Sequence, residues 1–197
     1  MDEIVIRSML KWPDVPAVYG WLSLDRRGSW MIKNVSGRFE RIANPAVNEF
    51  IGRNYAADAQ GRWYFQNGPQ RVFVALDYTP RVYRLDDAGE GLLAHTGAAP
   101  RALKTLFVDD AGALLLETEL GVGVLLDRDL PAFVERLTDP SGGAPERMLE
   151  DVARGQEARA LLRGASVRVA PIRGAEVPRL FGFVQHPSPL AGEPECA

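Results

Sequence analysis

Two runs of aromatic and apolar residues flank a polar break in the stretch WYFQNGPQRVFVALDYTP, which spans residues 63–80. The stretch reads as two strands, because an aromatic run and an apolar run flank a break at residues 67–69. At the break, Asn-Gly supplies the positive φ of a tight turn, and Pro69 fixes the φ of the next position. The pattern therefore predicts a β-hairpin that turns at Gly68.

A second pattern, D-x-x-G, recurs between pairs of short apolar runs. Its clearest copies are Asp25 with Gly28, Asp58 with Gly61 and Asp109 with Gly112, and a weaker copy is Asp86 with Gly89. An aspartate can accept backbone N–H bonds within a turn, and a glycine takes the positive φ that closes it. The predicted structural turn residues are therefore Asp25, Gly28, Asp58, Gly61, Gly68, Asp109 and Gly112.

Helices are fewer than strands in this pattern. They are predicted within residues 2–11, in PAVNEFIGRN after Asn44, in PERMLEDVAR before Gly155 and, for a turn or two, after Pro131. Asn44 is a candidate N-cap, and a proline opens each of the two middle segments, where its missing N–H costs least. After Gly155 the pattern returns to a hairpin about Gly164.

A shift of 51 residues brings three pairs of positions into register: Asp58 with Asp109, Gly61 with Gly112, and Pro80 with Pro131. Apolar positions between these landmarks match, whereas identities are few. Either a diverged duplication or a chance agreement between two hairpins accounts for this, and we favour duplication.

The elements together predict an α+β fold of duplicated antiparallel β-hairpin units, with a few helices packed on the sheets. The predicted organisation is an N-terminal helix and arm (1–17), a first α/β unit (18–88), a second β unit (89–137), a linker (138–145), a C-terminal helix and hairpin (146–186) and a disordered tail (187–197).

Composition and charge narrow the classes of partner. With 197 residues, 46% of them hydrophobic and 25% charged, the chain can bury a core of ordinary size. The net charge of −3 argues against general binding to nucleic acids or anionic membranes, which requires a basic surface. No apolar run approaches the ~20 residues that span a bilayer, and the acidic N-terminus lacks the features of a secretory signal. We expect a cytoplasmic monomer or homodimer.

The sequence carries no complete catalytic or metal-binding motif. Two histidines, His95 and His186, and one cysteine, Cys196, are too few for an ordinary zinc site. The glycines of GVGV at residues 121–124 lack the third glycine and the helix of a dinucleotide-binding loop. We also find no nucleophile elbow, so we expect no cofactor and no metal, and we rank an enzyme below a binding protein.

The candidate ligand-binding residues lie on and beside the first predicted hairpin: Trp63, Phe65, Gln70, Arg71 and Phe73. A guanidinium near aromatic faces suits a planar or anionic small ligand. The alternative is that this stretch is a hairpin turn and nothing more. The N-terminal half contains further aromatic residues that either line a pocket or form the core, namely Trp12, Trp21, Trp30, Tyr19 and Tyr55.

The position of Arg71 distinguishes two arrangements of this hairpin. Side chains alternate along a strand, so Arg71 and Phe73 share one face while Val72 and Val74 share the other. If the two valines are in the core, Arg71 and Phe73 form a mixed cationic and aromatic surface. If Phe73 is in the core, we expect Arg71 to be drawn inward, where it needs a carboxylate partner.

Several segments, in this order, resemble uncharacterised proteobacterial domain-of-unknown-function proteins: LDRRGSWMIKN, the helix from Pro45, GRWYFQNGPQRVFVALDYTPRVYRL and ETELGVGVLLDRDLPAFV. The resemblance covers residues 18–137 best. Related families are built of repeated α/β units with a suggested role in signalling or small-molecule sensing, and the resemblance implies no catalytic residues.

The function predicted from the sequence is that of a non-catalytic module that binds a small molecule or a protein and has a regulatory role. One alternative is an enzyme of unknown type, which lacks a matched nucleophile and base. The other is a structural or oligomerising protein that uses an exposed sheet edge.

Overall fold

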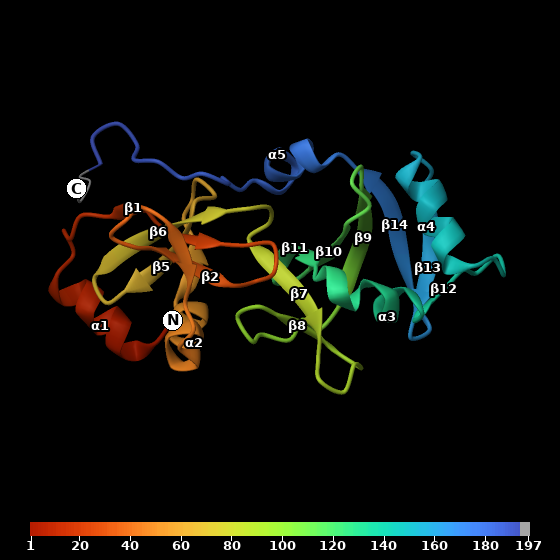
Figure 1. Ribbon diagram of the computed structural model, residues 1–197, viewed down its shortest axis with the longest axis horizontal. Coiled ribbons are helices and arrows are strands. Elements are labelled where there is room, and N and C mark those ends of the chain that lie inside the picture. Colours follow the sequence, from red (N-terminus) through yellow and green to blue (C-terminus); the bar gives the residue numbers. More distant parts are fainter. Residues whose placement is uncertain (194–197) are drawn as a thin grey trace. The chain divides into compact units, whose positions relative to one another are not determined.

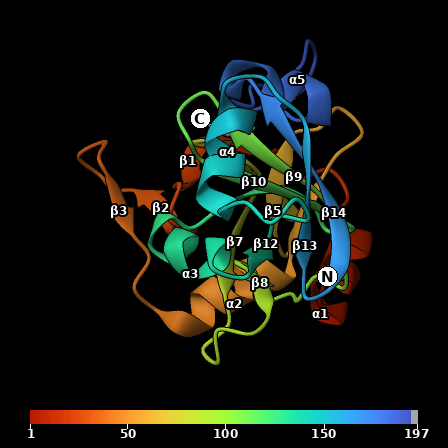
Figure 2. The ribbon, with the colours of Figure 1, turned by 90° about the vertical axis from the view of Figure 1, so that its right-hand side faces the viewer.

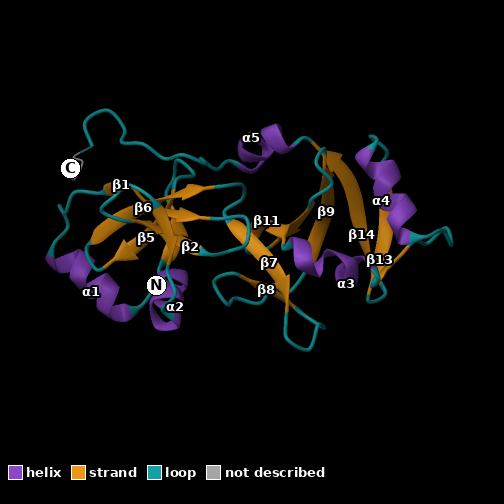
Figure 3. Cartoon of the chain, viewed as in Figure 1, coloured by secondary structure: helices purple, strands orange, loops and turns teal. Residues whose placement is uncertain are grey.

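The structure is a computed structural model, and it describes residues 1–193 (Figure 1). The chain forms two compact units, of which unit 1 contains Met1–Pro80 and the segment from Gly182 onward, and unit 2 contains Arg81–Phe181. Each unit has its own sheet, and strands make up most of the regular structure in both (Figure 3). The fold is therefore mixed α+β, while the finer segment boundaries given above remain predictions.

Unit 1 contains a six-stranded sheet with two helices. Its elements are α1 (Glu3–Lys11), β1 (Val18–Leu24), β2 (Trp30–Lys33), β3 (Phe39–Arg41), α2 (Pro45–Arg53), β4 (Tyr55–Ala57), β5 (Trp63–Asn67) and β6 (Gln70–Leu76). The strand order is β3-β2-β1-β6-β5-β4, and the neighbours are antiparallel except for the parallel pair β1 and β6.

The sheet of unit 1 is covered on both faces. On one face α2 packs through Phe50, whose ring meets Phe65 edge-on at 5.5 Å. The valine Val74 lies on this face and is fully buried. On the other face Phe73 is also buried, beneath the stacked ring of Tyr19 at 4.5 Å. Two buried faces explain why the β6 sequence is nearly continuous in apolar residues.

Unit 2 contains an eight-stranded sheet and short helices. Its elements are β7 (Arg81–Leu85), β8 (Leu92–Ala94), β9 (Leu103–Asp109), β10 (Leu114–Thr118), β11 (Gly121–Leu125), η1 (Asp127–Asp129), α3 (Leu130–Val134), β12 (Leu137–Thr138), α4 (Pro145–Ala153), β13 (Ala158–Leu162), β14 (Ala165–Ile172), η2 (Gly174–Glu176) and α5 (Val177–Phe181). The strand order is β12-β13-β14-β9-β10-β11-β7-β8.

The core of unit 2 lies between its sheet and the two helices α3 and α4. Figure 2 shows α4 lying across the strands of this unit. The helices contribute the buried side chains of Phe133, Met148 and Val152, which pack with apolar residues of the strands. Within α4, Val152 follows Leu149 by three positions and Met148 by four, which produces the apolar face that the sequence pattern predicts.

Both sheets are mixed, which departs from the antiparallel hairpins expected from the sequence. Antiparallel hairpins are present, but parallel pairs join them: β1 with β6, β7 with β11, and β9 with β14. The order of connections recurs between the units. In each, a first hairpin is followed by a three-strand meander whose last strand pairs in parallel with the first strand of the hairpin.

The D-x-x-G turns at Asp25, Asp58 and Asp109 share one geometry. In each, Oδ1 of the aspartate accepts hydrogen bonds at 2.7–3.0 Å from the backbone N–H groups two and four positions later. The φ angles of the three glycines are 79°, 77° and 80° for Gly28, Gly61 and Gly112. Asn34 begins another turn of this kind, because its Oδ1 accepts hydrogen bonds from Ser36 N and Arg38 N. The D-x-x-G pattern does not include this turn, since its first residue is an asparagine.

The break at residues 67–69 is a two-residue hairpin turn between β5 and β6. Asn67 pairs with Gln70, so Gly68 and Pro69 are the two central residues. Gly68 has a φ of 57°, and Pro69 has the negative φ of its ring, which together are typical of a type II′ turn.

The helices α1 to α4 follow the local signals in the sequence. Asn44 Oδ1 accepts a hydrogen bond from Ala46 N at 3.0 Å, which caps α2. The helices α1, α3 and α4 also lie where the pattern predicts them. No sequence signal indicated α5, which is only five residues long. Among residues 1–193, no helix has both the length and the apolar composition needed to cross a bilayer.

Candidate functional site

A hollow of about 420 Å³ in unit 1 lies between α1 and the face of the sheet that bears Phe73. We call it the α1 hollow. Apolar residues of α1 and of the loop after it form one side, and the residues that bear its chemistry are Trp12, Tyr19, Gln66, Arg71, Phe73 and Glu193. Its volume is within the range of small-molecule sites.

Gln66 is the most unusual residue of the α1 hollow. Its side chain is 1% exposed, and its Nε2 donates a hydrogen bond to the backbone oxygen of Gly68 at 2.9 Å. This bond fixes the orientation of the amide, since the reversed amide would place two acceptors together. Oε1 then has no hydrogen-bond partner among the residues that the structure describes. An unsatisfied buried acceptor costs about 1–3 kcal/mol, so this atom marks a place where a bound donor is favourable.

Aromatic rings form the floor of the hollow. Tyr19 stacks on Phe73 with an interplanar angle of 9°, and Tyr64 meets Phe73 edge-on at 5.8 Å. The hollow thus has a flat apolar surface next to a buried amide oxygen, and this combination suits a planar ligand with a polar edge.

Arg71 lies at the rim of the hollow. Its guanidinium is 4.8 Å from the centre of the Tyr64 ring, a cation–π contact that holds the side chain over the aromatic floor. It forms no ion pair within residues 1–193, and it is exposed although Phe73 on the same face is buried. The expectation that a buried Phe73 would draw Arg71 inward is therefore wrong, because Arg71 is near the strand end and reaches solvent.

A largely buried cluster of charges adjoins the hollow through Glu193. Arg62 Nε donates to Asp58 Oδ2 at 2.7 Å, and its two terminal nitrogens donate to Glu193 at 2.7 and 2.8 Å. The guanidinium also lies over the Phe73 ring at 4.6 Å. This cluster attaches the segment that contains Glu193 to the sheet of unit 1.

The charge cluster shifts the titration of its members away from neutral pH. Hydrogen bonds from Arg62 lower the pKa of Glu193 to about 2. Burial, and then the hydrogen bond to Glu193, raise the pKa of Tyr19 to about 12. Hydrogen bonds to Glu193 raise the pKa of Arg62. At neutral pH Glu193 is therefore an anion, Tyr19 is a neutral phenol and Arg62 is a cation.

The structure distributes the five candidate ligand-binding residues over two faces. Arg71 and Phe73 line the α1 hollow. Trp63 and Phe65 lie on the other face, where Trp63 contacts Tyr55 at 4.7 Å. Gln70 donates to the backbone oxygen of Pro16 at 3.2 Å and so fixes the loop that follows α1.

Four residues that bear the chemistry of the hollow were not among the five candidate ligand-binding residues from the sequence. Gln66 could have been identified from the sequence, because it is a polar residue within an otherwise aromatic strand. Trp12 and Tyr19 were named among the aromatic residues that either line a pocket or form the core, and both line the hollow. Glu193 has no local signal, because its role depends on an ion pair with a residue 131 positions away.

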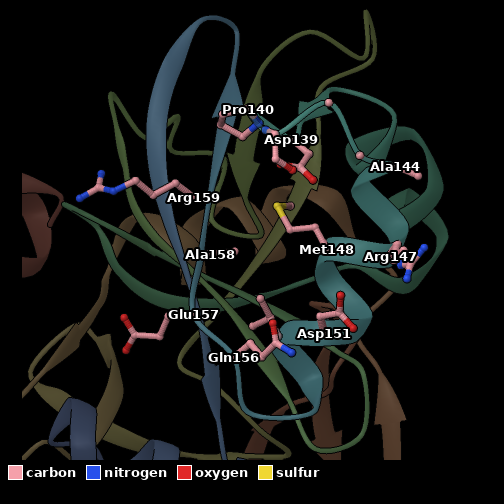
Figure 4. A pocket seen from close by; sticks show the side chains of 14 residues that line it. Asp139, Pro140, Ala144, Arg147, Met148, Asp151, Gln156, Glu157, Ala158 and Arg159 are labelled. Atoms are coloured by element: carbon pink, nitrogen blue, oxygen red, sulfur yellow. Dashed lines mark hydrogen bonds between the residues drawn. The ribbon is translucent and has the colours of Figure 1, made fainter.

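A second, larger hollow of about 700 Å³ lies in unit 2 beside α4 (Figure 4). Arg147 and Arg159 point away from its middle in opposite directions. Its carboxylates already have partners, because Asp151 pairs with Arg154 at 2.9 Å and Glu157 pairs with Arg168. The third, Asp139, accepts hydrogen bonds from Ser141. The carboxylates of this hollow are therefore already engaged, and among residues 1–193 no buried polar side-chain atom without a partner lines it, in contrast to the α1 hollow.

Neither hollow has the ligands of a metal centre. Among residues 1–193, the structure brings no three side chains of histidine, cysteine, aspartate or glutamate together in a group that could hold a metal ion.

Comparison with solved structures identifies a protein of similar fold. A DUF1285 family protein from Silicibacter pomeroyi DSS-3 has a similar structure, with a TM-score of 0.51 and 14% sequence identity over 83% of this chain and 86% of that chain. At this identity the similarity concerns the fold alone. No curated protein matches the sequence.

The sequence model of the DUF2944 family, described as "Protein of unknown function (DUF2946)", matches residues 1–188. This match confirms the prediction of a domain-of-unknown-function protein. Because the match spans nearly the whole chain, the protein belongs to the DUF2944 family.

Proposed function

We propose that the protein is a non-catalytic, cytoplasmic binding module and that a small molecule occupies the α1 hollow. The observation that carries the proposal is Oε1 of Gln66, a buried acceptor without a partner in residues 1–193. A ligand with an N–H or O–H group directed at this atom removes the cost of leaving it unsatisfied.

The other side chains of the hollow define the class of ligand. The stacked rings of Tyr19 and Phe73 favour a flat apolar body. The exposed guanidinium of Arg71 favours an anionic group, because its planar fork matches a carboxylate or phosphate. The proposed ligand is thus a planar organic anion that also carries a hydrogen-bond donor.

The titratable groups of the hollow favour binding over catalysis. A general acid or base works best with a pKa near the operating pH. Glu193 and Tyr19 have pKa values of about 2 and about 12, and both are held by the Arg62 cluster. Neither is suited to exchange a proton at neutral pH, so we propose a sensing or regulatory role in which occupancy is the signal.

The proposal is tested with hippurate, which combines an aromatic ring, an amide N–H and a carboxylate. N-methylhippurate lacks the N–H, and benzamide lacks the carboxylate. We expect hippurate to raise the melting temperature of the wild-type protein more than either analogue does. The variant Gln66→Leu should lose the preference for hippurate over N-methylhippurate, and Arg71→Gln should lose the preference over benzamide.

The matched control is Arg41→Gln, which removes an exposed arginine of β3 outside the hollow. It should behave as the wild type does. Equal responses of all four proteins to all three compounds would contradict the proposal. Native mass spectrometry of the purified protein supplies a separate test, because a retained organic anion lost in Gln66→Leu supports the same site.

We also propose that the two units descend from one duplicated unit. The support is the shared order of connections, in which β1, β2, β4, β5 and β6 correspond to β7, β8, β9, β10 and β11. The turns at Gly61 and Gly112 fall between corresponding strands. Pro80 and Pro131, the third pair of positions in the 51-residue shift, correspond less well, because Pro131 is within α3 whereas Pro80 directly precedes β7. Superposition of the two sets of five strands tests this, and a failure to align their turns would contradict it.

A further inference from the structure

Three arginines from separate segments of unit 2 surround a small hollow of about 170 Å³. Arg101 precedes β9, Arg136 follows α3, and Arg163 is in the turn between β13 and β14. We call this site the arginine hollow. The three residues are far apart in the sequence, so the fold brings them together.

The floor of the arginine hollow is apolar. Leu85 and Phe133 are buried there, and the partly buried side chains of Leu92, Leu103 and Leu162 complete it. These residues belong to the core of unit 2. A ligand in this hollow would therefore meet an apolar surface below and positive charge at the rim.

The positive charge of the rim is not neutralised within the described part of the chain. None of the three guanidinium groups has a carboxylate within 4.0 Å in residues 1–193. The lining contains one carboxylate, Glu90. The nearby carboxylates of Asp86 and Glu119 accept backbone N–H bonds, from Gly91 at 2.7 Å and from Ala102 at 3.3 Å respectively.

Arg163 has a backbone conformation that is unfavourable for an arginine. Its φ is 52°, a positive value found at no other non-glycine residue among residues 1–193. Leu162 pairs with Ala165, so Arg163 and Gly164 form a two-residue turn with positive φ at both positions, as a type I′ turn requires. Asparagine is the residue usually favoured at the first of these positions. An arginine at this position lowers local stability, and Arg163 is one of the residues that line the hollow.

We propose that the arginine hollow binds a small organic phosphate monoester, with the phosphate at the three guanidinium groups and the apolar part on the leucine and phenylalanine floor. Arginine matches the oxygens of a phosphate in a two-pronged geometry. Three cations and one carboxylate favour a dianionic head group over a monoanionic one. This site is in unit 2 and is independent of the ligand proposed for the α1 hollow.

Titration calorimetry with phenyl phosphate at constant ionic strength tests the proposal. We expect saturable binding of one molecule, weaker binding of inorganic phosphate, and no binding of phenol. Arg163→Asn and Arg136→Gln should each raise the dissociation constant at least tenfold. Arg159→Gln, on β13 outside the arginine hollow, should leave it unchanged.

Arg163→Asn separates binding from folding, because asparagine suits the turn better than arginine does. The variant should melt at or above the temperature of the wild type and yet bind phenyl phosphate more weakly. Unchanged binding in this variant, or an equal loss in Arg159→Gln, would overturn the proposal. Absence of saturable binding to the wild type would also overturn it. Gln66→Leu should bind phenyl phosphate as the wild type does, so failure of either site can be assigned separately.

Discussion

Gly61 cannot carry a side chain for two separate reasons. Its φ is 77°, which is costly for any residue with a Cβ. In addition, a Cβ at this position would lie 2.1 Å from the backbone oxygen of Gly182. Gly112 occupies the corresponding turn of unit 2 with a φ of 80°, but there a Cβ would meet nothing within 4 Å.

The pair of glycines gives a matched prediction. Gly112→Ala should lower the free energy of unfolding by about 1–2 kcal/mol, the cost of the left-handed backbone. Gly61→Ala should lower it further, because the 182–185 segment must also move. Urea denaturation of both variants measures the difference, and equal losses would show that the contact with Gly182 does not constrain Gly61.

His95 is a half-buried titratable residue of unit 2, and its Nε2 atom is shielded from solvent. It accepts a hydrogen bond at Nδ1 from Val82 N at 3.2 Å, and burial, followed by the charge of Arg81, lowers its pKa to about 3 from an ordinary value of 6.5. Between these two values the unfolded chain binds a proton that the folded chain does not. Proton binding therefore favours the unfolded chain. The contribution of neutral His95 to the free energy of unfolding is fully present above pH 6.5 and is lost as the pH decreases towards 3.

The pH dependence should be measurable between pH 7 and pH 5. In that interval the wild-type protein should lose about 2 kcal/mol of unfolding free energy through His95. Carboxylates such as Glu193, with an ordinary pKa of 4.5, contribute mainly below this interval. His95→Gln should remove this part of the slope, as followed by urea denaturation at each pH. A variant that keeps the full slope would show that another group is responsible.

At the scale of elements, the C-terminal segment is attached to unit 1 by specific bonds. Val184 N donates to Gly61 O at 2.9 Å, and Leu76 N donates to Gln185 O at 2.8 Å. The ion pair between Arg62 and Glu193 then holds the rest of the segment against the sheet. The guanidinium side of this pair is 5% exposed, so solvent screens the pair less than an ordinary surface ion pair.

Loss of this ion pair should release the segment without unfolding the unit. We expect Glu193→Gln to speed hydrogen exchange at the amides of residues 184–190, as measured by mass spectrometry. Glu49→Gln, which changes an exposed glutamate 3.8 Å from Arg53, is the control and should not change these rates. The same exchange rates in Glu193→Gln and in the wild type would mean that the backbone bonds alone hold the segment.

Elements with local causes were predictable from the sequence, and elements with distant causes were not. Asn44 and the following proline determine the start of α2 by themselves, and the turn at Gly68 follows from the φ preferences of two adjacent residues. The parallel pairing of β1 with β6 joins residues about fifty positions apart, and no local pattern encodes it.

The residues of the candidate site also divide into those with a local signal in the sequence and those whose role depends on distant contacts. Arg71 and Phe73 were predicted because their hairpin is visible in the sequence. The contribution of Gln66 depends on α1 covering its strand, and that of Glu193 depends on an arginine 131 residues away. The prediction for Arg71 assumed that one face of β6 is in the core and the other is open. Both faces are buried, so this assumption does not hold.

At the scale of the whole molecule, unit 2 is continuous in sequence whereas unit 1 is not. Residues 1–80 form the strands of unit 1, but partners for Gly61 O and Leu76 N come from residues after 181. Gln185 Nε2 donates to Tyr78 O at 3.0 Å, so the two parts of unit 1 approach each other closely.

This organisation predicts different behaviour of isolated fragments. Residues 81–181 alone should unfold cooperatively on heating, because their core is complete. Residues 1–80 alone should melt at a lower temperature than residues 1–80 joined to residues 182–193 by a short glycine-serine linker. Circular dichroism of the three fragments measures this. Identical melting of the two unit 1 fragments would show that the C-terminal segment adds no stability.

The interrupted sequence of unit 1 has a consequence for biosynthesis. A ribosome adds about 5–20 residues per second, so roughly 5–20 s pass between the synthesis of residue 80 and that of residue 182. Unit 2 has all its strands by the end of that interval, while nascent unit 1 still lacks Gln185, the partner of the Leu76 amide, and Glu193, a partner of the Arg62 guanidinium. The half of the protein that is translated first is therefore the half that matures last, and a chaperone that recognises exposed aromatic strands would meet it during that wait.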